Sequence, residues 1–135
     1  MVGYRSREPG SQRPPAGLPG FLAPTVGDFL GLLSNSRSNA ITEKLITLAA
    51  TYLPKTPVIA LKIYLGIEKY FSHLLRSDHT PFWEADIPSI MWTDTADFRN
   101  PNYHLPTDTP DTLDYELIAD VTKLALGRAV SRSAK

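Results

Sequence analysis

The stretch GDFLGLLSNSRSNAITEKLITLAATYLPKTPVIALKIYLG, residues 27–66, predicts a strand, a helix and a second strand in succession. Its first nine residues are an apolar run closed by Ser and Asn, which indicates a short buried strand. Ser38 or Asn39 can cap a helix that continues to about residue 53, with apolar residues at helical spacing. Residues 58–66 are nearly all apolar and end at a glycine, which is typical of a strand covered on both faces.

The segments after this unit continue the alternation. Residues 79–86 predict a helical turn, and residues 87–95 predict a third strand. Residues 112–130 have the strongest helical periodicity in the chain, and Asp111 with Asp114 three residues later predicts the cap of that helix. This order of elements predicts an α/β fold in which helices flank a mixed sheet.

The length and the N-terminal composition bound the domain organisation. The 135 residues are enough for one domain, so residues 1–135 are expected to form a single unit. Residues 5–25 contain five of the twelve prolines and predict an irregular loop. The first residues carry no apolar signal segment, and the localisation stays open.

The charge and the residue types exclude several classes of function. A formal net charge of zero gives no reason to expect nucleic acid or an anionic membrane as a partner. The apolar runs are too short to span a bilayer. The absence of cysteine excludes a disulfide scaffold, a thiolate zinc site and a cysteine nucleophile.

The segment FRNPNYHLPTDTPDTLDY, residues 98–115, places the pair Tyr103–His104 in a loop after the third predicted strand. Its three prolines exclude a helix or a central strand there. Sites in open α/β sheets lie at the carboxyl ends of strands, and a neutral imidazole is a common zinc ligand. From the residues alone, His104 is either a metal ligand or a surface histidine, and Tyr103 either lines a site or packs.

The segment RSDHTPFWEADIPSIMWTDTADFRNPNYHLPTDTPDTLDYELIADV, residues 76–121, contains a Ser-Asp-His-x-x-Phe motif, an Ile-Pro strand, a Tyr-His pair, a Thr/Asp loop and an amphipathic helix in that order. It resembles the C-terminal part of the zinc exopeptidases that include bacterial leucyl aminopeptidases, glutamate carboxypeptidase and glutaminyl cyclases, which form metallopeptidase family 28. MVGYRSREPGSQ, residues 1–12, resembles the segment just after a central strand of that family. The resemblance therefore implies the zinc-exopeptidase (phosphorylase/hydrolase-like) fold, present here as its C-terminal half.

The resemblance also implies roles for five residues. His104 resembles the last zinc ligand, and Tyr103 resembles a residue that lines the pocket and donates to the oxyanion of the tetrahedral intermediate. Asp78 resembles an acidic residue close to the reaction centre, although it is also a candidate helix cap. His79 and Phe82 are expected in the wall of the substrate pocket.

The remaining metal ligands of that family and its general-base Glu have no counterpart in this sequence. The complete family site holds two zinc ions, and one histidine does not bind zinc tightly, since catalytic zinc sites use three protein ligands per metal. The resemblance therefore implies the C-terminal part of a zinc-dependent aminopeptidase-like peptidase, inactive alone and acting on peptide N-termini when complete. The alternatives are a non-catalytic remnant or interaction module and, with less support because those relatives favour Trp at position 103, a glutaminyl-cyclase-type acyltransferase.

Two expectations about placement follow. His104 should project toward the carboxyl ends of the strands, with Asp78 and Tyr103 lining one cavity and the second ring N–H of His104 donating to Asp108 or a loop carbonyl. One of the first two strands should present an unpaired edge or an uncovered apolar face, which favours self-association or pairing with a missing N-terminal half.

Overall fold

Three strands and three α-helices alternate along the residues that this computed structural model describes, 2–15 and 23–133. They are β1 Leu30–Ser34, α1 Asn39–Tyr52, β2 Val58–Lys62, α2 Thr80–Glu84, β3 Ile90–Thr93 and α3 Tyr115–Ser133. Short 3-10 turns lie at Ile67–Tyr70, Ser72–Leu75, Ala96–Phe98 and Pro110–Thr112. Residues 5–15 and 23–25 form neither helix nor strand, as their prolines predict.

The sheet has the order β2-β1-β3 and is mixed, as predicted. β1 pairs in parallel with β2, with Leu32 opposite Ala60, and antiparallel with β3, with Leu32 opposite Trp92. The parallel pair is joined by α1, because parallel strands need a crossover connection. The segment 27–66 is therefore a β-α-β unit, and the predicted α/β class is confirmed.

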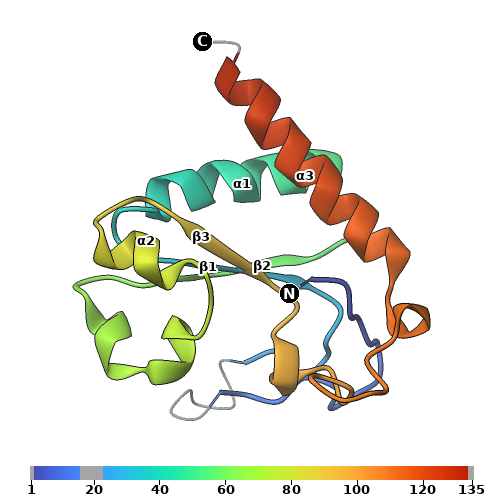
Figure 1. Ribbon diagram of the computed structural model, residues 1–135. Helices are drawn as coiled ribbons and strands as arrows, with labels where there is room; N and C mark the ends of the chain where they lie inside the picture. The colour runs from blue at the N-terminus through green and yellow to red at the C-terminus, as the bar shows by residue number, and fades with distance from the viewer. Residues whose placement is uncertain (1, 16–22, 134–135) are drawn as a thin grey trace.

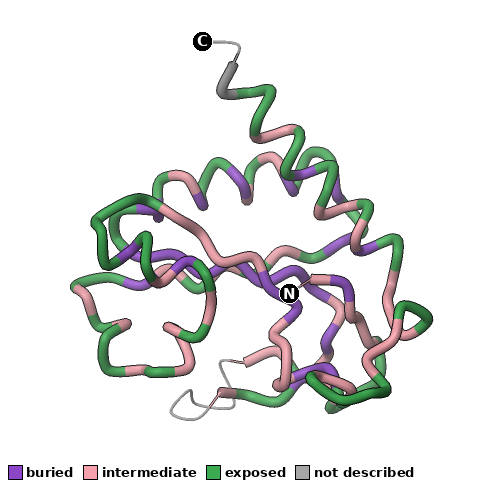
Figure 2. Tube along the Cα trace, viewed as in Figure 1, coloured by how far each residue is buried: buried purple, intermediate pink, exposed green. Residues whose placement is uncertain are grey.

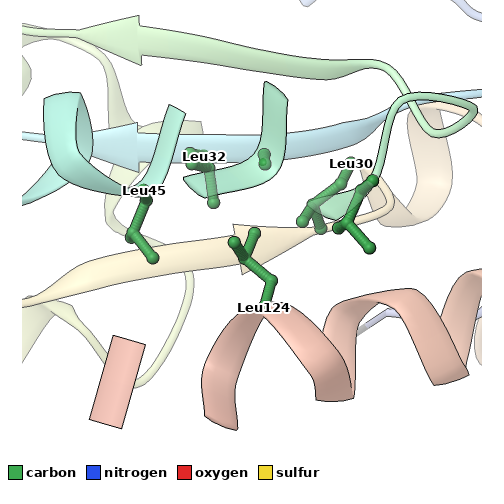
Figure 3. Packing of buried hydrophobic residues seen from close by; sticks show 6 residues of the cluster. Leu30, Leu32, Leu45 and Leu124 are labelled. Atoms are coloured by element: carbon green, nitrogen blue, oxygen red, sulfur yellow. The ribbon is translucent and has the colours of Figure 1, made fainter. Parts of the chain in front are cut away.

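One face of the sheet is covered by α1 and α3, which lie on the same side of it (Figure 1). Leu30 and Leu32 of β1 point into this layer and pack with Leu45 of α1 and Leu124 of α3. Figure 3 shows these four side chains gathered between the helices and the strands. Buried residues are concentrated along β1 and the inner sides of the two helices in Figure 2. The apolar periodicity of the two helices thus identified the main core.

The other face of the sheet carries a smaller cluster. Leu33, Ile63 and Trp83 are buried there, and residues of the 3-10 turn Ser72–Leu75 pack against them. Neither long helix reaches this side (Figure 1). Among the described residues, no helix is long and apolar enough to cross a membrane.

β2 differs from its prediction in length and in burial. The strand ends at Lys62 and does not extend to Gly66, because Leu65 and Gly66 have positive φ angles of 61° and 73° and start a turn. Its side chains alternate between half-buried and exposed, and Ile59 and Leu61 are 41% and 45% exposed. The prediction of cover on both faces is wrong, since β2 is an edge strand with helices on one side only. An uncovered apolar face was expected for one of the first two strands, and β2 has one.

The start of α3 is fixed by Asp114 and not by Asp111. Asp114 Oδ1 accepts a hydrogen bond from the backbone N–H of Leu117 at 2.9 Å, which is the geometry of an N-cap. Its Oδ2 accepts from Nε of Arg5 at 2.6 Å, and the backbone N–H of Asp114 donates to the carbonyl of Gly3. Burial raises the pKa of Asp114, but the hydrogen bonds from Arg5 and Leu117 outweigh it and leave this pKa below its usual value. The N-terminal segment therefore ties α3 to the sheet.

Candidate functional site

The loop after β3 begins with a buried carboxylate, Asp94. Its Oδ2 accepts a hydrogen bond from the backbone N–H of Tyr4 at 3.0 Å, and its Oδ1 accepts from the N–H of Ala96 at 3.2 Å. Thr95 and Ala96 have positive φ angles of 69° and 49°, which non-glycine residues seldom adopt. Backbone strain of this kind persists where the surroundings hold it, and here Asp94 and the N-terminal segment do so.

The loop lies at the end of the sheet where β1 and β2 begin. β3 is antiparallel to β1, so its carboxyl end is next to the amino ends of the two parallel strands. The prediction that His104 meets the carboxyl ends of the strands is therefore wrong for β1 and β2. The rule that places sites at strand carboxyl ends applies to parallel strands, and the sequence alone did not show that β3 is reversed.

Arg99 anchors the loop from inside. Its side chain is buried, with the residue only 4% exposed, and Nη1 donates to the carbonyl oxygen of Phe29 at 2.8 Å. Nε donates to Oε1 of Gln12 at 3.0 Å, and the guanidinium carbon lies 4.3 Å from the centre of the Phe29 ring. Burial lowers the pKa of Arg99 to about 10, while Asp94 and Asp28 act in the opposite direction. The group is therefore a buried cation at neutral pH.

Asn100, the next residue, organises the turn that carries the Tyr103–His104 pair. It is buried, and its Nδ2 donates to Oδ1 of Asp108 at 3.2 Å. Its Oδ1 accepts from the backbone N–H of Asn102 at 2.9 Å, and its carbonyl accepts from the N–H of Tyr103 at 3.3 Å. One side chain thus links the two ends of the turn.

His104 lies exposed on this turn, stacked on Tyr103. The two ring centres are 4.0 Å apart and the ring planes differ by 25°. His104 has a positive φ of 59°, and it is exposed and not packed against α3, which agrees with the expectation that it projects from its loop. The predicted bond from His104 to Asp108 or to a loop carbonyl is not formed among the described residues, and Asp108 Oδ1 accepts from Asn100 instead. Within the described part of the chain, the imidazole makes no hydrogen bond, so both ring nitrogens are available to a ligand from outside.

Tyr103 lines a cavity of about 220 Å³ on the sheet face that α1 and α3 leave open; we call it the sheet-face cavity. The floor is formed by strand residues, namely Gly31, Leu33, Ile59, Leu61, Met91 and Thr93. Leu74 and Phe98 are further wall residues, and an ion pair between Arg76 and Asp97, 3.5 Å apart, lies among the lining residues. Apolar walls with a few polar groups at one side are typical of a small-molecule or side-chain pocket.

The other three predicted residues lie at a second, neighbouring cavity between α2 and β3, which we call the α2 cavity. Asp78, His79 and Phe82 line it, and Ser77 lines both cavities. The prediction that Asp78 and Tyr103 line one cavity is therefore wrong, although the two cavities adjoin at Ser77. Phe82 is exposed and its ring is free to contact a ligand.

His79 is built into the packing beneath the α2 cavity. It is 5% exposed, its Nε2–H donates to the carbonyl of Leu74 at 2.8 Å, and its ring meets the Trp83 ring edge-on. Burial lowers the pKa of His79, while the Leu74 carbonyl and the charge of Asp78 act to raise it. These contacts give His79 a structural role, whatever it contributes to the cavity.

The buried pair Arg99–Asn100 was not among the residues predicted for the site. A signal was present, because Arg99 is the single basic residue between Asp94 and Asp120, where seven residues are acidic. A lone cation in such a segment needs several acceptors close by. The acceptors of Arg99, Gln12 and the Phe29 carbonyl, come from distant segments that no local pattern connects.

The sequence model of peptidase family M28 matches residues 38–128, from the start of α1 into α3. The chain belongs to peptidase family M28. The matched region contains the Tyr103–His104 turn, Asp78, His79 and Phe82, and it confirms the family that the sequence resembles.

The chain is also similar to one curated protein and to one solved structure. The chain is 36% identical over 123 residues to the uncharacterized protein YfbL of Escherichia coli, a match that covers 90% of this chain and 36% of YfbL. The crystal structure of the Legionella protein LapA superposes with a TM-score of 0.64 and 21% identity, covering all of this chain and 30% of LapA. The LapA match shows the fold, and the chain spans about a third of the length of either protein.

The resemblance to M28 peptidases implies a zinc site. The residues that the structure describes do not form such a site by themselves. Across residues 2–15 and 23–133, no three His, Asp or Glu side chains gather closely enough to hold a metal ion. Catalytic zinc requires three protein ligands. His104 can supply one nitrogen, and the others would have to come from outside these residues.

Proposed function

We propose that the chain is the C-terminal part of an M28 aminopeptidase-like peptidase and that it contributes His104 and Tyr103 to a site completed by further polypeptide. The observation that carries this proposal is the exposed, stacked Tyr103–His104 pair, whose tyrosine lines an apolar cavity. His104 would serve as one zinc ligand in that site. When bound, zinc would supply electrophilic activation of a peptide carbonyl and of water.

The residues of this chain would bind and orient the substrate. The floor of the sheet-face cavity would accept the apolar side chain of the peptide's first residue. The Tyr103 hydroxyl would face the reacting carbonyl and would donate a hydrogen bond to it. Asp78, beyond Ser77 in the α2 cavity, would act through hydrogen bonds to substrate or to neighbouring groups. His79 and Phe82 would form the wall beside it.

The proposed protein partner is the part of the M28 domain that this chain does not span, and the second candidate is another copy of the chain. The support is the open face of β2, where Ile59 and Leu61 are exposed next to an unpaired strand edge. Edges and apolar faces of this kind favour association.

A second candidate function is a non-catalytic interaction module. It is favoured by the failure of the described residues to form any metal-holding group of three. In that case the chain would use the same open face without contributing to chemistry.

Reconstitution tests these proposals. The chain is mixed or co-expressed with a separate polypeptide that covers the part of YfbL outside the matched region, with zinc present, and hydrolysis of leucyl arylamide is measured. We expect no activity from the chain alone and clear activity from the mixture. His104→Ala should abolish it, and Tyr103→Phe should lower it about 10²-fold. Tyr52→Phe, an exposed tyrosine on α1, is the control.

The outcomes separate the two functions. A stable complex that shows no hydrolysis with any aminoacyl arylamide would favour the interaction module. Hydrolysis by the chain alone that disappears in His104→Ala would contradict the proposal that the site needs further polypeptide.

A further inference from the structure

Arg99 is the point at which the N-terminal segment and the start of β1 meet the loop that leads into the Tyr103–His104 turn. Its Nη1 donates to the carbonyl oxygens of Phe29, just before β1, and of Tyr4 in the N-terminal segment. Its Nε donates to Gln12, and Gln12 Oε1 also accepts from the hydroxyl of Thr95 at 2.9 Å. The guanidinium therefore connects the start of the sheet with the N-terminal segment and, through Gln12, with the strained residues Thr95 and Ala96.

The chain around Arg99 is shaped to its side chain. A Cβ added at Gly27 would lie 2.7 Å from Cγ and 2.8 Å from Cδ and Nε of Arg99, closer than real Cβ atoms approach. The aliphatic part of Arg99 thus occupies the space that any larger residue at position 27 would need. Glycine at this position follows from the presence of Arg99.

Stability alone does not account for a buried arginine at this position. Nη2 is buried and has no hydrogen-bond partner among the described residues, and a buried donor without a partner costs free energy. Apolar residues of similar volume often replace buried charges with no loss of stability. What an apolar residue cannot do is hold three carbonyl or amide oxygens at fixed directions, which the planar guanidinium does.

We propose that Arg99 is a positioning residue that fixes the Asp94–Asn100 turn against the start of β1, so that Tyr103 faces the sheet-face cavity and His104 is presented to solvent. The inference rests on the proposed function of the Tyr103–His104 pair. Arg99 acts one residue before Asn100, whose side chain and carbonyl set the turn, and it does not contact a substrate itself. Without the fork of Arg99, the turn loses its attachment to β1 and to Gln12.

The first test measures the order of the Tyr103–His104 turn in the full chain and needs no enzyme assay. Arg99→Lys keeps the charge but cannot make the forked contacts. We expect ¹⁵N order parameters at Tyr103, His104 and Leu105 to fall from about 0.85 to below about 0.6, with α1 unchanged. The ring protons of His104, which lie over the Tyr103 ring, should move to the shifts of a free histidine as the stack is lost. Arg37→Lys, at an exposed arginine paired with Asp86, is the matched control and should change neither signal.

A second variant leaves Arg99 intact and displaces it. Gly27→Ala should reproduce the loss of the His104 ring shift, because its methyl group pushes on the Arg99 side chain. Gly127→Ala, where an added Cβ meets nothing within 4 Å, is the control and should leave the His104 shift unchanged. Agreement between Arg99→Lys and Gly27→Ala assigns the effect to the position of Arg99 and not to its charge.

The third test uses the reconstituted protein. Arg99→Lys should lower kcat about 10²-fold for leucyl arylamide, since misplacing a reacting group by about 1 Å costs that much. The inference is overturned if Arg99→Lys keeps the order parameters and the His104 shift of the wild type, or if all amide groups loosen equally. If the wild-type mixture is inactive, the proposed function fails, and the two measurements on the chain alone still decide the role of Arg99.

Discussion

The two faces of the sheet are built from similar apolar side chains, and only one of them is closed. Leu32 of β1 faces α1 and α3 and is 1% exposed, whereas Leu61 of β2 faces the other way and is 45% exposed. The covered face holds a continuous cluster with both long helices, and the open face holds a cavity beside a smaller cluster. The difference shows that the main hydrophobic core lies on the face covered by helices. The face with the candidate site is left partly uncovered.

The largest expected difference between the faces is in the free energy of unfolding. Leu32→Ala should destabilise the chain by about 3 kcal/mol, because it opens a cavity in the closed cluster. Leu61→Ala, the same change on the open face, should cost less than about 1 kcal/mol, because much of this side chain is already in water. Urea unfolding followed by circular dichroism measures both. Equal losses would show that the open face is covered in solution.

The attachment of α3 to the covered face can be tested at Asp114. Asp114→Ala removes the N-cap and the nearer of the two carboxylate partners of the buried Arg5 side chain, so it should destabilise by about 2 kcal/mol. Asp114→Asn keeps an oxygen for the cap and should recover part of that loss. If both variants unfold at the wild-type denaturant midpoint, the N-terminal segment does not hold α3 in place.

The open face should also govern association. Leu61→Lys places a charge among the exposed apolar residues of β2, and it should weaken self-association or binding of the completing polypeptide about tenfold, or about 1.4 kcal/mol. Sedimentation equilibrium measures this. Leu126→Lys, at an exposed leucine of α3, is the control and should leave the association constant unchanged. Loss of association in the control alone would place the interface on the helices.

The smallest expected effect is a pH dependence from the cluster on the open face. Burial lowers the folded pKa of His79 below its unfolded value of about 6.5, so the unfolded chain binds this proton more readily. The contribution is complete above pH 6.5 and declines as the pH falls below 6.5 toward the folded pKa. The urea midpoint of unfolding should decrease as the pH is lowered from 7.5 to 5. His79→Gln should reduce this dependence of the midpoint on pH. A slope unchanged by His79→Gln would show that His79 protonates as easily in the folded state.

Several features were predictable because they depend on local pattern. Apolar periodicity predicts the β-α-β unit and the C-terminal helix α3. The prolines that exclude regular structure predict the loop on which His104 is exposed. Motif order also identified the family, since a run of short motifs at set spacing is a property of the sequence itself. These predictions needed no knowledge of which segments meet.

Other features depended on segments that are far apart in the sequence. The direction of β3, and with it the end of the sheet that carries His104, is set by pairing with β1 and not by any residue of β3 alone. The same pairing puts Asp78 and Tyr103 at two adjoining cavities. The burial of β2 was misjudged because an apolar run looks the same whether one face or both are covered.

The sequence by itself determined the fold class, the family and the identity of the exposed imidazole, because these rest on residue type and spacing along one segment. Only the tertiary structure decided how that imidazole is held. Arg99 finds its acceptors at Tyr4, Gln12 and Phe29, between 70 and 95 positions away in the chain. A guanidinium bonds to whichever oxygens folding brings within hydrogen-bond distance, and no local pattern specifies which oxygens those are.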